Sequence, residues 1–162
     1  MIIDVCLNDA VLEAIREVIE TMTFAAVEES SASHSLGSDS IMGTITFRNT
    51  IKGCLAFNCN LPCAKAVAAN MLGLDNQDDL PDEDVADAIG EITNMVMGSL
   101  KTRLSDSYED IQVSIPSVVR GRELVTSLAD GASRASVWVC IDDKYYANFS
   151  LLLRNDNGNG NT

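Results

Sequence analysis

Residues 87–98 read Asp87-Ala88-Ile89-Gly90-Glu91-Ile92-Thr93-Asn94-Met95-Val96-Met97-Gly98, and they lie within a segment that has the periodicity of an amphipathic helix. At about 100° per residue, five aliphatic residues fall on one side of this helix. These residues are Val85, Ile89, Ile92, Val96 and Leu100. The acidic run Asp82-Glu83-Asp84 favours a helix start, because negative charge suits the N-terminal end of the helix dipole. The pattern therefore predicts a long helix from this run to Leu104, with its aliphatic side buried.

The opposite side of the same helix carries Asp87, Glu91, Asn94 and Gly98, a combination that is costly for a purely structural surface. Asn is unfavourable inside a helix because its side chain competes for backbone hydrogen bonds. Gly costs about 1 kcal/mol relative to Ala, and two acids one turn apart repel each other. This face is interpreted as a surface that meets a partner. The alternative is a solvated face on which Asn94 is incidental.

Helical and β-type segments are expected on both sides of this helix. Before it, the patterns predict a helix over Asp9–Val27 that is capped by Asp9, followed by a polar loop over Glu29–Asp39. Two strands, over Ile41–Phe47 and Ile51–Cys59, are expected next. A helix over Pro62–Met71, which ends at Gly73, completes this part. After it, they predict a strand over Ile111–Val119, a short strand over Leu124–Leu128, and a hairpin of Ser133–Ile141 and Lys144–Leu153. Pro116 interrupts the first of these strands, which indicates a strand end or a sheet edge.

The order of these elements predicts an α+β fold. A short internal repeat aligns Ala14–Val18 with Ala88–Ile92, and each helix is followed by β-rich segments. We expect a two-layer domain, with an antiparallel sheet, helices packed on one face and a pseudo-twofold internal repeat. Residues 1–154 are expected to form this single domain. Residues 155–162 contain no apolar side chain and are predicted to be a disordered tail.

Composition excludes several classes of protein. The 162 residues have a mass of 17.4 kDa and a net charge of −13, which argues against nucleic acid or an anionic membrane as the main partner. No apolar run approaches the ~18 residues needed to cross a bilayer. The first residues, Met1–Val5, include an early acid and lack the basic start of a signal peptide. A cytoplasmic location is therefore predicted.

The cysteines and the single histidine offer little support for metal or nucleophilic chemistry. Five scattered cysteines are an odd number, and the pair Cys59 and Cys63 lacks the second half of a zinc site. The one histidine, His34, lies in a Ser-rich stretch, where a triad base is hard to build. We expect reduced core thiols and no cofactor.

The string from Asp87 to Gly98 resembles the CheC/CheX/FliY family of chemotaxis phosphatases. The family pattern has an acidic or small residue, then a Glu, then an Asn three positions later and a Pro some twenty residues further on. Asp87, Glu91, Asn94 and Pro116 occupy these places. The order of elements is most similar to the CheX branch, and the resemblance covers Ile2 to Arg154. It implies a single active site and a homodimer that pairs through sheet edges.

In this family the activity is dephosphorylation of the aspartyl phosphate of a CheY-type response regulator. The resemblance implies that Asn94 orients the attacking water and that Glu91 pairs with a receiver lysine. An acyl phosphate is already activated, so a helper protein needs only to place one water in line, and a carboxamide can hold it. Mg²⁺ would belong to the receiver. Partner contacts are predicted at Asp87, Gly90, Gly98 and Lys101, with the glycines allowing a close approach.

The first helix departs from the two-site members of the family. Its aligned positions are Glu17 and Glu20, so the amide is missing, and these two acids are predicted to be a solvated helix face. A second hypothesis for the whole chain is a binding module of the same fold without catalysis, as in flagellar switch proteins.

The negative charge is concentrated before and within the central helix. Eight of the 24 acids lie between residues 75 and 91, a stretch without Lys or Arg. They are Asp75, Asp78, Asp79, Asp82, Glu83, Asp84, Asp87 and Glu91. Their field is predicted to favour a receiver that carries a lysine, with an association rate that falls as salt rises.

Overall fold

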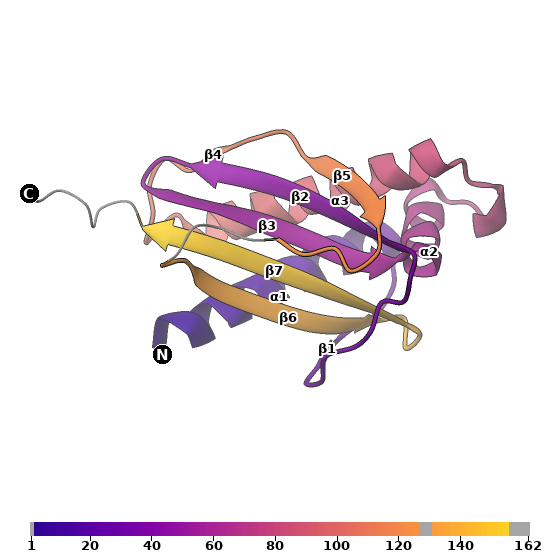
Figure 1. The fold of residues 1–162 in the computed structure, drawn as a ribbon, viewed down its shortest axis with the longest axis horizontal. Coiled ribbons are helices and arrows are strands. Elements are labelled where there is room, and N and C mark those ends of the chain that lie inside the picture. Colours follow the sequence, from indigo (N-terminus) through magenta and orange to yellow (C-terminus); the bar gives the residue numbers. More distant parts are fainter. Residues whose placement is uncertain (1, 127–130, 156–162) are drawn as a thin grey trace, which may run out of the picture.

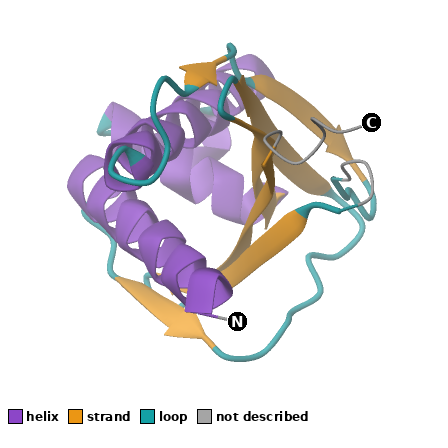
Figure 2. Cartoon of the chain, turned by 90° about the vertical axis from the view of Figure 1, so that its left-hand side faces the viewer, coloured by secondary structure: helices purple, strands orange, loops and turns teal. Residues whose placement is uncertain are grey.

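A computed structural model of the chain describes residues 2–126 and 131–155. Helices cover one face of a single antiparallel sheet (Figures 1 and 2). The helices are α1 (Ile2–Thr23), α2 (Leu61–Leu72) and α3 (Asp82–Leu104), with a short 3-10 turn, η1 (Gln77–Asp79), between the last two. The strands are β1 (Val27–Ser30), β2 (Ser40–Arg48), β3 (Ile51–Asn60), β4 (Gln112–Val113), β5 (Ser117–Gly121), β6 (Ser133–Ile141) and β7 (Tyr145–Asn155). The predicted two-layer α+β class is confirmed, and the internal repeat stays a prediction.

The sheet has the order β1-β6-β7-β3-β2, and both β4 and β5 pair with the free side of β2. Every pairing within the described residues is antiparallel. Three residues, 142–144, connect β6 to β7, and two of them, Asp142 and Asp143, adopt positive φ values of 58° and 55°, which Asp tolerates better than most residues. The two edges of the sheet are therefore β1 on one side and the β4–β5 segment on the other.

The core lies between the sheet and the helices. Phe57 of β3 and Phe149 of β7 are register partners, and their rings stack with centroids 4.4 Å apart. The aliphatic stripe predicted on the central helix is buried here. Its members Val85, Ile89, Ile92, Val96 and Leu100 are all at most 1% exposed. α3 is thus fixed along its whole length, which leaves its opposite side toward solvent.

A close approach between β2 and α3 depends on Gly43. A methyl group at this position would overlap the Thr93 hydroxyl oxygen and would lie 3.2 Å from Ile89 Cγ2. The Thr93 hydroxyl donates to the Ile89 carbonyl oxygen at 2.7 Å and so has no freedom to move away cheaply. The absence of a side chain on β2 therefore sets how deeply α3 sits on the sheet.

Several predicted boundaries are corrected by the structure. α1 runs without interruption through Asp9, so this residue is inside the helix and does not cap it. The helix ends at Thr23, and the next turn leads into β1, a strand absent from the sequence prediction. The predicted strand at Leu124–Leu128 is wrong for residues 124–126, which form no strand, while residues 127 and 128 lie outside the described residues.

Other boundaries agree closely with the prediction. Gly73 ends α2 in the left-handed region at φ 67°, and Asn60 caps the start of α2 by accepting from the Cys63 N–H at 2.9 Å. Pro116 separates β4 from β5, so the predicted interruption at a sheet edge is confirmed. The predicted tail is wrong for its first residue, since Asn155 is the last residue of β7, and residues 156–162 lie outside the described residues.

No helix in the described ranges is long and apolar enough to span a membrane.

Candidate functional site

The exposed side of α3 forms a continuous ridge. We use the name α3 ridge for Asp87, Glu91, Asn94, Gly98 and Lys101, which follow one another at alternating spacings of three and four residues. All five are exposed, and the buried aliphatic stripe lies on the other side of the helix. The ridge thus presents two carboxylates, a carboxamide, a bare segment of backbone and an ammonium group in one line.

Glu91 and Asn94 are available for contact with another molecule. Within the described part of the chain, neither side chain has a hydrogen-bond or ion-pair partner. They are three residues apart on a regular helix, so their side chains project from the same face. A carboxamide can donate and accept hydrogen bonds at once, and a carboxylate can accept from an ammonium group. The pair can therefore hold a water and a cation next to each other.

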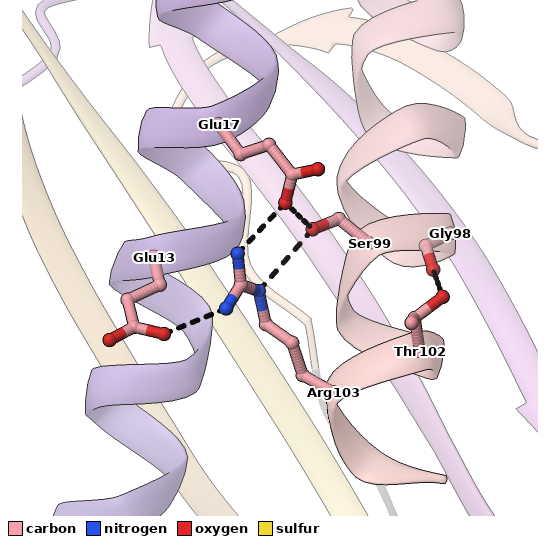
Figure 3. A network of polar contacts seen from close by, with 6 residues as sticks. All are labelled: Glu13, Glu17, Gly98, Ser99, Thr102 and Arg103. Atoms are coloured by element: carbon pink, nitrogen blue, oxygen red, sulfur yellow. Dashed lines mark hydrogen bonds and ion pairs between the residues drawn. The ribbon is translucent and has the colours of Figure 1, made fainter.

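Gly98 leaves part of the helix backbone open. A methyl group added at this position would meet no atom within 4 Å. The Thr102 hydroxyl donates to the Gly98 carbonyl oxygen at 3.2 Å, on the same exposed part of the helix (Figure 3). The structure therefore needs no glycine here for packing, unlike at Gly43, although glycine weakens the helix by about 1 kcal/mol relative to Ala.

Gly90 does not belong to the α3 ridge. It is buried, and a methyl group at this position would lie 3.4 Å from Val118 Cγ2 and 3.8 Å from Pro116 Cγ. The prediction that Gly90 allows a partner to approach is therefore wrong, because this side of the helix faces the β4–β5 segment. The missing side chain of Gly90 instead lets Pro116 and Val118 pack closely against α3, directly before Glu91.

An ion-pair network joins α1 to the C-terminal half of α3 (Figure 3). Arg103 lies between two glutamates of α1, with Nη1 at 2.7 Å from Glu13 Oε2 and Nη2 at 2.8 Å from Glu17 Oε2. The Ser99 hydroxyl also donates to Glu17 Oε2 at 2.6 Å. Glu17 is thus a bridge between helices, although its side chain is 58% exposed, as expected of a solvated helix face; its pairing with Arg103 was not predicted. Glu20, one turn further, stays exposed.

The pKa of Glu17 should make this bridge sensitive to acid. The Ser99 hydrogen bond, and then Arg103, lower the pKa of Glu17 below its usual value of 4.5. Because the folded-state pKa is the lower one, the stabilisation is complete above pH 4.5 and is lost as the pH falls through the folded-state value. We expect Glu17→Gln to be less stable than wild type in urea denaturation at pH 7, with a difference that shrinks below pH 4.5. Glu20→Gln is the control, and a Glu17→Gln difference that persists in acid would contradict the assignment.

A second arginine holds the N-terminal end of α3 against the sheet edge. Arg120 of β5 contacts Asp39 with Nη2 at 2.8 Å from Oδ2, and Asp82 with Nη1 at 3.2 Å from Oδ2. These contacts lower the pKa of Asp39 and raise the pKa of Arg120. Of the eight acids between residues 75 and 91, Asp82 is therefore paired, whereas the other seven are exposed and have no ion-pair partner within the described residues.

The structure offers no built metal or triad site in the part of the chain it describes. Residues 2–126 and 131–155 contain no cluster of three His, Cys, Asp or Glu side chains that could hold a metal ion. His34 stacks on Tyr146 with ring centroids 3.6 Å apart, and its Nε2 lies 2.8 Å from the Ser30 hydroxyl. Among the described residues, no carboxylate is hydrogen-bonded to the other ring nitrogen, as a Ser-His-Asp triad would need.

The chain is similar to a family model, to a curated protein and to several solved structures. The profile of the Chemotaxis phosphatase CheX family matches residues 41–140, a range that includes the α3 ridge. A protein of Thermotoga maritima named CheY-P phosphatase CheX is 32% identical over 117 residues, which cover 71% of this chain and 73% of the relative. The crystal structure of the chemotaxis protein CheX from Vibrio vulnificus has a TM-score of 0.76 at 22% identity and covers 91% of this chain and 96% of its own. The CheX in a CheX–CheY–BeF3–Mg complex from Borrelia burgdorferi has a TM-score of 0.72 at 16% identity, over 90% and 96% of the two chains.

Proposed function

Because the chain belongs to the CheX family of chemotaxis phosphatases, we propose that it accelerates hydrolysis of the aspartyl phosphate of a CheY-type response regulator. The observation that carries this proposal is the α3 ridge, on which Glu91 and Asn94 are exposed, unpaired among the described residues and held on a helix that is buried along its other side. The name of the Thermotoga maritima relative and the complex of the Borrelia burgdorferi relative with CheY support the choice of substrate.

Asn94 is proposed to orient the water that attacks phosphorus. Its carboxamide oxygen can accept a hydrogen bond from this water while the amide N–H group donates to a phosphoryl or carboxylate oxygen. As the water oxygen bonds to phosphorus, the bond from phosphorus to the aspartyl oxygen breaks, which releases inorganic phosphate and the free carboxylate. Because the acyl phosphate is already activated, positioning of the water is the main contribution that this chain has to supply.

Glu91 is proposed to pair with the lysine of the receiver and so to dock the ridge over the phosphate. Its carboxylate is one turn from Asn94, which lets a single helix face make both contacts. The unpaired acids that lead into α3 surround this docking point and attract the positively charged group. No cofactor of this chain takes part in the proposal, since Mg²⁺ would belong to the receiver.

The proposal also includes a cytoplasmic homodimer. The sheet has two edges at which a second copy can pair, β1 and the β4–β5 segment. β1 has only four residues, and the β4–β5 segment is interrupted by Pro116.

The test of the proposed function is a phosphate-release assay. Each CheY-type receiver of the same organism is phosphorylated with a small-molecule phosphodonor, and its loss of phosphate is followed with and without the wild-type protein. Acceleration above the rate of the receiver alone supports the phosphatase. Stable capture of a receiver or of switch components in a pull-down, without any change in phosphate lifetime, would favour the non-catalytic binding module instead.

Gly98→Ala separates a functional role of this glycine from a structural one. Because the added methyl group meets no atom within 4 Å, we expect a more stable protein, by about 1 kcal/mol in urea denaturation. If a receiver approaches the bare backbone, the same methyl group should raise the KM for the phosphorylated receiver several-fold. Asn70→Ala, at an exposed position of α2, is the control for a gain in helix propensity away from the ridge. A more stable Gly98→Ala protein with unchanged KM would show that nothing approaches the backbone there.

A further inference from the structure

An exposed apolar side chain lies next to the α3 ridge on the segment between β4 and β5. Ile115 is 86% exposed and immediately precedes Pro116, the residue that packs toward Gly90. Two contacts show that the segment from Arg120 back to Pro116 runs along α3. Arg120 forms an ion pair with Asp82 at the start of the helix, and Pro116 lies near Gly90. Ile115 is the next residue along this path, and the residues of α3 that directly follow Gly90 include Glu91 and Asn94. Figure 1 shows this segment along the free side of β2, near α3.

The backbone around Ile115 is held in place. The Ser114 N–H donates to the Thr46 carbonyl oxygen at 2.9 Å, and the Ser114 hydroxyl accepts from the Thr46 N–H at 3.1 Å. The same hydroxyl donates to the Ile115 carbonyl oxygen at 3.1 Å. On the other side, Pro116 has a restricted φ. An apolar group presented on a fixed backbone loses little conformational entropy when it is buried by a partner.

The α3 ridge itself supplies no apolar contact. Its members are two acids, an amide, a glycine and a lysine, and an ion pair that stays open to water contributes little to affinity. Interfaces that use polar groups well surround them with apolar contacts that exclude water. Ile115 is suited to this, because its side chain is 86% exposed and its neighbour Pro116 packs toward Gly90, the residue before Glu91.

We propose that Ile115 is an apolar docking contact for the phosphorylated receiver, seated beside the proposed contacts of Glu91 and Asn94. This inference rests on the proposed phosphatase function. The occupant is the receiver because the contact is continuous with the α3 ridge and with the unpaired acids that would attract the receiver lysine. The role is one of binding, so it should appear in KM and not in kcat.

The experiment compares Ile115→Asp with Val125→Asp in the phosphate-release assay. Val125 is a matched control because it is 83% exposed but belongs to residues 122–126, which lie over the sheet face turned away from the helices. There the Asn58 side chain donates to the Leu124 carbonyl oxygen at 3.1 Å. For Ile115→Asp we expect KM to rise about tenfold or more, with kcat within twofold of wild type. Ile115→Leu, which keeps an apolar side chain, should have the KM of wild type. Val125→Asp should leave both KM and kcat unchanged.

The possible failures are distinguishable. Wild-type protein that does not shorten the phosphate lifetime overturns the proposed function and this inference together. Normal acceleration by wild type with an unchanged KM for Ile115→Asp overturns the docking contact alone. An unchanged KM combined with a change in sedimentation coefficient would assign Ile115 to contact with a second copy of this chain.

Discussion

Asn94→Ala is expected to lower kcat for the phosphorylated receiver about 100-fold, because without the carboxamide the attacking water is no longer held in line with the bond that breaks. KM should change little, because the Asn94 side chain is not proposed to supply the ion pair that docks the ridge. The fold should be unaffected, since Asn94 is exposed and makes no side-chain hydrogen bond within the described residues. The measurement is kcat and KM in the phosphate-release assay, together with urea denaturation of both proteins.

Asn70→Ala is the matched control for Asn94→Ala, because both side chains are exposed on helices and have no hydrogen-bond partner in the described part of the chain. It should leave kcat and KM unchanged. An Asn94→Ala protein with the kcat of wild type would remove the carboxamide from the mechanism. A large rise in KM at constant kcat would mean that Asn94 serves in binding only.

Glu91→Ala is expected to have the second large effect, this time on both parameters. Loss of the carboxylate leaves the receiver lysine without its partner, which should raise KM about 10- to 100-fold. A helix that docks less accurately should also place the Asn94 side chain less accurately, so kcat should fall. Glu91→Gln, which keeps the shape and removes the charge, should show most of the KM effect. KM of the wild type should rise with salt, and that dependence should be weaker in Glu91→Gln.

The control for Glu91 is Glu29→Ala, which removes one exposed acid from β1, at the sheet edge away from the β4–β5 segment. Removal of that charge should change KM only slightly. Equal effects of Glu29→Ala and Glu91→Ala would indicate that net charge, and not a specific ion pair, controls the encounter.

The elements that were predicted well are those with a strong local signal. The aliphatic stripe of α3 could be recognised because five residues repeat at helical spacing, and the same calculation placed Asp87, Glu91, Asn94 and Gly98 on the exposed side. Gly73 and Pro116 were also recognisable. Glycine is favoured where the backbone needs a positive φ, and proline, which lacks an N–H group, is tolerated in a sheet only at an edge or a strand end.

The features that the sequence could not reveal depend on which segments meet in three dimensions. Gly90 and Gly98 are both glycines inside the same predicted helix, so the sequence does not distinguish them. In the structure Pro116 and Val118 pack near Gly90, whereas no atom lies within 4 Å of a methyl group added at Gly98. Glu17 reaches an arginine 86 positions away in sequence, so a solvated acid and a bridging acid have the same local pattern. The sequence predicts that Ile115 belongs to the strand Ile111–Val119. In the structure it lies in the break between β4 and β5 and is exposed.

The central claim is tested most directly by the lifetime of the receiver phosphate under single-turnover conditions, with this protein in excess over the phosphorylated receiver. We expect wild type to shorten that lifetime about 100-fold relative to the receiver alone, and Asn94→Ala at the same concentration to leave it near the unassisted value. A lifetime that wild type does not change, or that Asn94→Ala shortens as much as wild type does, would contradict the assignment of the α3 ridge as the catalytic surface.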